Sequence, residues 1–112
     1  MTTMIALDVS TKNTGWAIFE DGKYKESGVI ACNNIEDKNV RIDEMAYFIL
    51  EKIRNSRADI CVVEQSILGN RNPDSFRMLS MILGIIFYHC YENGISYYSY
   101  LPSEWRKLID PG

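Results

Sequence analysis

Two acidic residues each follow a short apolar run, and their placement could support metal chemistry. Asp8 follows the run Met4–Leu7, and Glu64 follows the run Ile60–Val63. Runs of this length are typical of strands that are buried on both faces, and we expect this burial for both runs. A carboxylate is rarely buried unless it is paired or holds a metal. The simpler alternatives are that Asp8 caps its strand in a turn and that Glu64 caps a strand or pairs with a nearby lysine.

The segment between the two runs determines whether the carboxylates meet. A helix is predicted from about Asn39 to Asn55, because apolar residues recur there with the i, i+3, i+4, i+7 spacing of one helix face. A strand–helix–strand crossover makes the flanking strands parallel, with their ends on the same side of the sheet. The other helix face is predicted to be solvated, with the charged residues Arg41, Asp43, Glu44, Glu51, Lys52 and Arg54.

If the two strands are neighbours, Asp8 and Glu64 lie together although 56 positions separate them in the sequence. Two carboxylates in contact repel each other unless a cation lies between them. Oxygen ligands with room for water suit Mg²⁺ or Mn²⁺. The pattern therefore predicts a site for one of these ions at the carboxyl ends of two parallel strands.

The other elements follow from turn signals and periodicity. Ser10–Gly15 is a polar turn before a return strand, and Asp21-Gly22 is the strongest short hairpin signal. These turns predict an antiparallel meander at the start of the chain. The remaining predictions are a strand to about Cys32, a loop at Gln65–Asp74, a helix at Asp74–Tyr91 capped by Asp74 or Ser75, a strand at Ile95–Leu101 and a short helix at Glu104–Ile109.

Composition limits the classes of function. The 112 residues predict a single domain, and the net charge of −3 argues against a nucleic-acid binder that works by bulk electrostatics. No run is long enough to span a membrane, and no signal peptide opens the chain. Cys32, Cys61 and Cys90 are odd in number and lack CxxC spacing, so a reduced, cytoplasmic protein with structural thiols is predicted.

Three segments follow one another in the chain: Ile5–Ala17 (IALDxSxxxxGWA), Val62–Glu64 before a long helix, and Pro102–Lys107 (PSEWRK). In this order they resemble the RuvC-type Holliday-junction resolvases of the RNase H-like superfamily. The first segment alone is weak, because actin-like sugar kinases carry a similar hairpin. The resemblance implies an α/β fold with a five-stranded mixed sheet and helices on its faces. It also implies metal-dependent hydrolysis of branched DNA, with Asp8 and Glu64 as catalytic residues and metal ligands.

The end of the chain departs from that family. The resemblance implies further acidic ligands on a C-terminal helix, whereas the sequence stops at Asp110-Pro111-Gly112. Asp110 is a poor substitute, because it lies directly after the third segment. The expectation is an incomplete domain that lacks the C-terminal helix and cuts DNA poorly or not at all.

Candidate DNA contacts surround the two carboxylates in the sequence. Ile67 could wedge against a base and Arg71 could meet a phosphate, although an ordinary surface loop is an equal alternative. The tyrosines of Ile95–Leu101 could stack on bases, but strand propensity and half-buried packing explain them more simply. The predicted nucleic-acid-binding residues are Ser10, Thr11, Lys12, Asn13, Ile67, Asn70, Arg71 and Lys107.

The second predicted helix indicates how the protein could assemble. The Asp74–Tyr91 helix is apolar on nearly every face, which predicts a homodimer through it unless the first helix covers the excess. His89 is predicted to be a packed core residue and not a ligand. The alternatives to a nuclease are a module that binds branched nucleic acid without cutting it, and one lobe of an actin-like phosphotransferase.

Overall fold

The computed structural model describes residues 1–64 and 72–100. The predicted DNA contacts Ile67, Asn70, Arg71 and Lys107 lie outside these residues, as does the predicted helix at Glu104–Ile109. Asp110 lies outside them as well.

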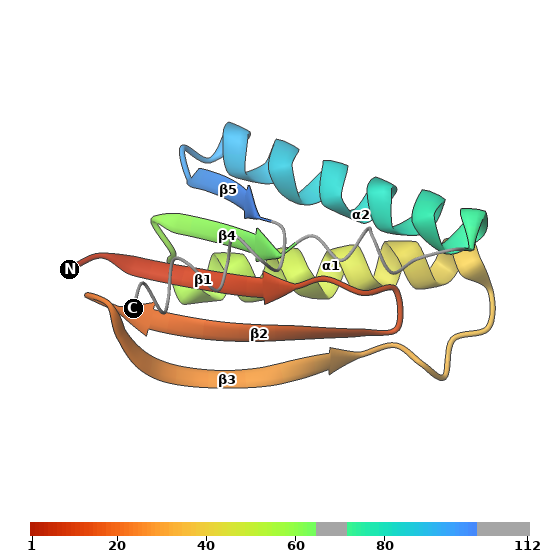
Figure 1. The fold of residues 1–112 in the computed structure, drawn as a ribbon, viewed down its shortest axis with the longest axis horizontal. Coiled ribbons are helices and arrows are strands. Elements are labelled where there is room, and N and C mark those ends of the chain that lie inside the picture. Colours follow the sequence, from red (N-terminus) through yellow and green to blue (C-terminus); the bar gives the residue numbers. More distant parts are fainter. Residues whose placement is uncertain (65–71, 101–112) are drawn as a thin grey trace.

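A five-stranded mixed sheet forms the centre of the molecule, in the order β3-β2-β1-β4-β5 (Figure 1). β1 pairs antiparallel with β2 and parallel with β4, while β2–β3 is antiparallel and β4–β5 parallel. The predicted hairpin is confirmed, with positive φ angles at both Asp21 and Gly22. The strands are β1 (Thr3–Asp8), β2 (Asn13–Glu20), β3 (Lys23–Ala31), β4 (Ile60–Glu64) and β5 (Ser96–Tyr100).

Two helices pack on one face of this sheet. α1 (Lys38–Ser56) passes behind β1 and β4 in Figure 1, and α2 (Pro73–Glu92) contacts α1 and β5. The core consists of residues from the helices and of alternate strand residues. Its fully buried members include Ile5, Met45, Ile49, Ile53, Cys61, Val63, Met78, Ile82 and Ile86.

The sheet has a second face that carries the acidic residues. β1 was expected to be buried on both faces, but only Thr3, Ile5 and Leu7 are buried, and Met4 and Ala6 are half-buried. Side chains alternate along a strand, so Asp8 shares its face with Met4 and Ala6 and points away from the helices. The expectation of burial on both faces is therefore wrong for β1 and correct for the centre of β4.

The N-cap of α2 differs from the prediction. Asn72 caps α2, because its side chain accepts from the N–H of Asp74 and Pro73 occupies the first turn. The predicted caps at Asp74 or Ser75 are thus wrong, and proline favours the first helical position. Lys38 and Asp74 form an ion pair that joins the first turns of α1 and α2. None of the described helices is long and apolar enough to cross a membrane.

Arg41 is not solvated, contrary to expectation. It is 9% exposed, and its Nη1 donates to the carbonyl of Ile35 at 3.0 Å. Its Nη2 lies 3.9 Å from the sulfur of Met78 on α2. The aliphatic stem and planar head therefore pack between α1, α2 and the segment before α1.

Candidate active site

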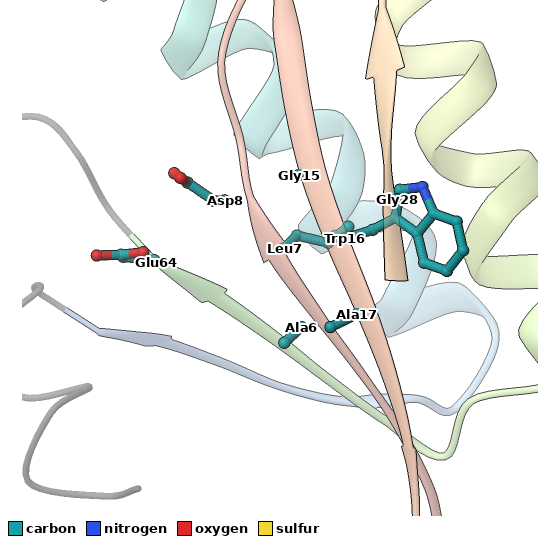
Figure 2. A pocket seen from close by; sticks show the side chains of 8 residues that line it. All are labelled: Ala6, Leu7, Asp8, Gly15, Trp16, Ala17, Gly28 and Glu64. Carbon is teal, nitrogen blue, oxygen red and sulfur yellow. The ribbon is translucent and has the colours of Figure 1, made fainter. Parts of the chain in front are cut away.

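Asp8 and Glu64 are paired in register at the carboxyl ends of β1 and β4. Because partner residues on neighbouring strands point to the same face, both carboxylates lie on the sheet face opposite the helices. Figure 2 shows the two side chains projecting to the same side. Asp8 is exposed and Glu64 is partly exposed. The predicted meeting of these two residues is confirmed.

A pocket of about 240 Å³ lies beside the pair. Small residues create it: Ala6, Ala17 and Gly15 occupy positions next to the carboxylates on β1 and β2. Leu7, Trp16 and Gly28 complete the lining. Trp16 extends past Gly28, away from the carboxylates (Figure 2). The amine of Lys52 lies 4.0 Å from the centroid of its ring. This cation–π contact corrects the expectation that Lys52 is simply solvated.

The turn between β1 and β2 is held by Thr14, which is fully buried. Its hydroxyl donates to the carbonyl of Ser10 at 3.0 Å and accepts from the N–H of Ser10 at 3.2 Å. The N–H of Cys32 donates to the carbonyl of Lys12 at 2.7 Å. These bonds fix the backbone that carries the four predicted contacts, Ser10, Thr11, Lys12 and Asn13.

A second pocket, of about 570 Å³, shares Asp8 with the first. All four predicted turn residues line it, so the structure brings them beside one of the carboxylates. Its far wall is Ser75 and Leu79 of α2, and the sequence analysis missed Ser75 as a site residue. The available signal was positional, because Ser75 lies in the first turn of α2, the next described element after the strand that ends at Glu64.

The donor set at Asp8 and Glu64 suits a hard divalent cation. Among residues 1–64 and 72–100, no group of three or more histidine, cysteine or acidic side chains could hold a metal. Mg²⁺, however, is commonly bound through one or two carboxylates, with waters and substrate phosphates completing the shell. The two carboxylates therefore fit such an ion as a partial ligand set.

The thiols and the histidine lie on the helix side of the sheet and not at the carboxylates. Cys32, Cys61 and Cys90 are buried and free. Burial raises the pKa of the Cys32 thiol, and a hydrogen bond with Cys90 together with burial raises that of Cys61. His89 is half-buried, so its prediction as a packed core residue is only partly correct. Burial and the charge of Arg54 lower the pKa of the His89 imidazole.

The fold of this chain has counterparts among solved structures. Thermus thermophilus RuvC in complex with a Holliday junction substrate aligns with a TM-score of 0.80 and 16% identity, over 98% of this chain and 71% of that chain. This chain has the RuvC fold. A second Thermus thermophilus RuvC structure aligns with a TM-score of 0.74 and 18% identity, over 95% of this chain and 68% of that one.

A viral protein shares the same RuvC-type architecture. The Fowlpox virus resolvase, in complex with Holliday junction DNA, aligns with a TM-score of 0.59 and 16% identity, over 88% of this chain and 61% of that one. No protein-family model matches the sequence, and no curated protein matches it significantly. The predicted RNase H-like, RuvC-type fold is therefore confirmed by structure, where sequence comparison finds no relative.

Proposed function

We propose that this chain carries the paired-carboxylate part of a divalent-metal endonuclease that acts on four-way DNA. The observation that carries the proposal is the register pairing of Asp8 with Glu64 on the accessible sheet face. The shared fold supports it, because the RuvC and Fowlpox virus resolvase structures contain Holliday junction DNA. The substrate and the reaction are thus inferred from the site and the fold together.

The two carboxylates would hold Mg²⁺ or Mn²⁺. Such an ion, when bound, can activate a water and stabilise the oxygen that leaves the phosphorus. The turn from Ser10 to Asn13 would bind the DNA backbone, because hydroxyl, amide and ammonium donors suit phosphate oxygens. Because the described residues supply two acidic ligands, we expect weak metal binding and slow cleavage.

We also propose that the protein is a dimer through α2. Apolar residues remain exposed on this helix after α1 has packed against it, among them Met81, Ile85 and Tyr88. They lie along a groove of about 480 Å³ that also includes Leu50 of α1. A second copy would bury this surface and would present two sites to the two-fold symmetry of a junction. The three buried free thiols favour a reducing, cytoplasmic setting.

A labelled four-way junction tests the main proposal. We expect the protein to bind the junction more tightly than a duplex of the same length and to cut it slowly in Mg²⁺ or Mn²⁺. Asp8→Asn and Glu64→Gln should lower cleavage by orders of magnitude while junction affinity changes only a few-fold, because phosphate contacts elsewhere carry binding. Asp43→Asn, which removes an exposed acid on α1, is the matched control.

Two outcomes would contradict the assignment. Equal affinity for duplex and junction would rule out branched DNA as the preferred substrate. Full cleavage by Asp8→Asn would remove the carboxylate pair as the metal site.

The runner-up is a module that binds branched DNA without cutting it. The small number of acidic side chains at the site favours this reading, since the described part of the chain offers two carboxylates and no third ligand group beside them. Junction binding with no cleavage in either ion would support it. Binding of ATP in place of DNA would instead support the actin-like phosphotransferase alternative.

A further inference from the structure

The tyrosines of β5 divide between the two faces of the sheet. Tyr97 stacks on Phe87 of α2, with ring centroids 5.3 Å apart and planes inclined by 19°. Tyr98 and Tyr100 point to the opposite face, where their own rings stack at 6.4 Å and 24°. The helix side therefore uses one tyrosine for packing, and the other two form a separate aromatic surface.

This aromatic surface is continuous with the carboxylate pair. Tyr100 is the register partner of Glu64, which is itself the partner of Asp8. One row of side chains thus crosses three neighbouring strands on the same face. Strands in a sheet lie about 4.8 Å apart, so the backbone of Tyr100 is about 10 Å from that of Asp8. Tyr98 lies two residues before Tyr100 on the same face and is the register partner of Val62.

Packing alone does not explain the pair. Tyr98 is 49% exposed, and neither ring belongs to the core cluster or to the partly buried residues that pack against it. Phe87 and Ile95, by contrast, do pack on that core. Tyr100 is partly exposed, so both stacked rings reach the surface beside the candidate site. Aromatic side chains are the platforms on which proteins stack unpaired bases.

The negative charge of the chain is a second reason to expect base stacking at this aromatic surface. The chain has a net charge of −3, and the site itself holds two carboxylates, so the overall charge does not attract DNA, and contacts with individual phosphates and bases must supply the affinity. Stacking is insensitive to that charge, because every base has an aromatic face. A platform next to the acidic residues would hold the strand where its phosphate approaches them.

We propose that Tyr98 and Tyr100 form a stacking platform for an unpaired nucleobase of the strand whose phosphate lies at Asp8 and Glu64. This inference rests on the proposed function, and it adds a requirement that the substrate present an unstacked base near the crossover. The platform is sequence-tolerant, because it offers rings and no hydrogen-bonding edge matched to one base.

The test uses a four-way junction with 2-aminopurine near the crossover, in Ca²⁺ to prevent cleavage. Binding of the protein should quench 2-aminopurine fluorescence. The double variant Tyr98→Leu/Tyr100→Leu should bind about 5- to 100-fold more weakly and should lose the quenching, whereas Tyr98→Phe/Tyr100→Phe should retain both. The matched control is Tyr24→Leu, an exposed tyrosine at the far edge of the same sheet.

Each outcome decides the inference. Unchanged affinity and quenching in the leucine variant would overturn the platform and leave the proposed function standing. Absence of junction binding by the wild-type protein would overturn both. If the double variant fails to fold by circular dichroism, Tyr98→Leu alone carries the test, because that side chain is half-exposed.

Discussion

The indole of Trp16 lies so close to Gly28 that a methyl group at Gly28 would be 2.7 Å from its Cζ2 atom. The two residues are register partners on β2 and β3. Trp16 is also held by Lys52 of α1, and both Trp16 and Gly28 line the pocket beside the carboxylates. The absence of a side chain at Gly28 therefore determines where the ring lies and shapes the floor of the candidate site.

Gly28→Ala should destabilise the protein by about 1–3 kcal/mol, because overpacking forces the ring from its position. Urea denaturation would measure the loss in the free energy of unfolding. Gly84→Ala is the matched control, since nothing lies within 4 Å of a methyl group there. On helix propensity alone it should stabilise α2 by about 1 kcal/mol. Equal effects of the two substitutions would contradict the close packing of Trp16 on Gly28.

The proposed dimer predicts a concentration-dependent mass. Light scattering coupled to size exclusion should show a dimer, because Met81 and Ile85 would lose their exposed apolar surface in the interface. Ile85→Glu should shift the equilibrium to monomer, since it would place a charge in an apolar contact. Val29→Glu, on the exposed side of β3, should leave the mass unchanged. A wild-type monomer at the highest attainable concentration would rule out the dimer.

The sequence was sufficient to predict that Asp8 meets Glu64, provided that their two strands are neighbours. The helical periodicity between them requires a crossover, and the crossover rule makes the strands parallel, so the register follows from where each apolar run ends. The same reasoning could not predict which face the carboxylates share. The Met4–Leu7 run is apolar at every position, so period-two alternation is absent and only the packed helices identify the buried side.

The burial of Arg41 and the division of the β5 tyrosines between two faces could not be predicted, for a related reason. The main hydrogen-bond partner of Arg41 is the backbone carbonyl of Ile35, which leaves no trace in side-chain periodicity. Tyr97, Tyr98 and Tyr100 have equal strand propensity, and only the position of Phe87 on α2 separates the tyrosine that stacks on a helix from the two that stack on each other. In each case a residue distant in the sequence determines where the side chain lies, and the local sequence pattern does not show it.

The lowered pKa of His89 predicts a loss of stability on mild acidification. Burial and the charge of Arg54 lower its pKa in the folded protein below the unfolded value near 6.5. The unfolded chain therefore binds the proton more readily, so this contribution to stability is present above about pH 6.5 and is lost as the pH falls through the folded pKa. Because His89 is the only histidine, His89→Gln should reduce the change in the urea midpoint between about pH 7.5 and 5.5. A midpoint that rises on acidification would contradict the lowered pKa.

The final prediction concerns metal binding by the carboxylate pair and does not depend on catalysis. Mg²⁺ or Mn²⁺ should raise the melting temperature only at high concentration, because two carboxylates form a partial ligand set. At ten times the dissociation constant, the free energy of unfolding should rise by about 1.4 kcal/mol. Asp8→Asn and Glu64→Gln should each abolish the metal-induced rise, whereas Asp43→Asn should preserve it.

The metal-free protein provides the complementary measurement. Because Asp8 and Glu64 are like charges on adjacent strands, either amide variant should melt no lower than the wild type when the divalent ion is removed with a chelator. Loss of stability without metal, together with loss of the metal-induced rise, would mean that the substitutions damage the fold. Tight metal binding that survives Asp8→Asn would place the ion elsewhere, and the register pairing of Asp8 with Glu64 would then have no role in catalysis.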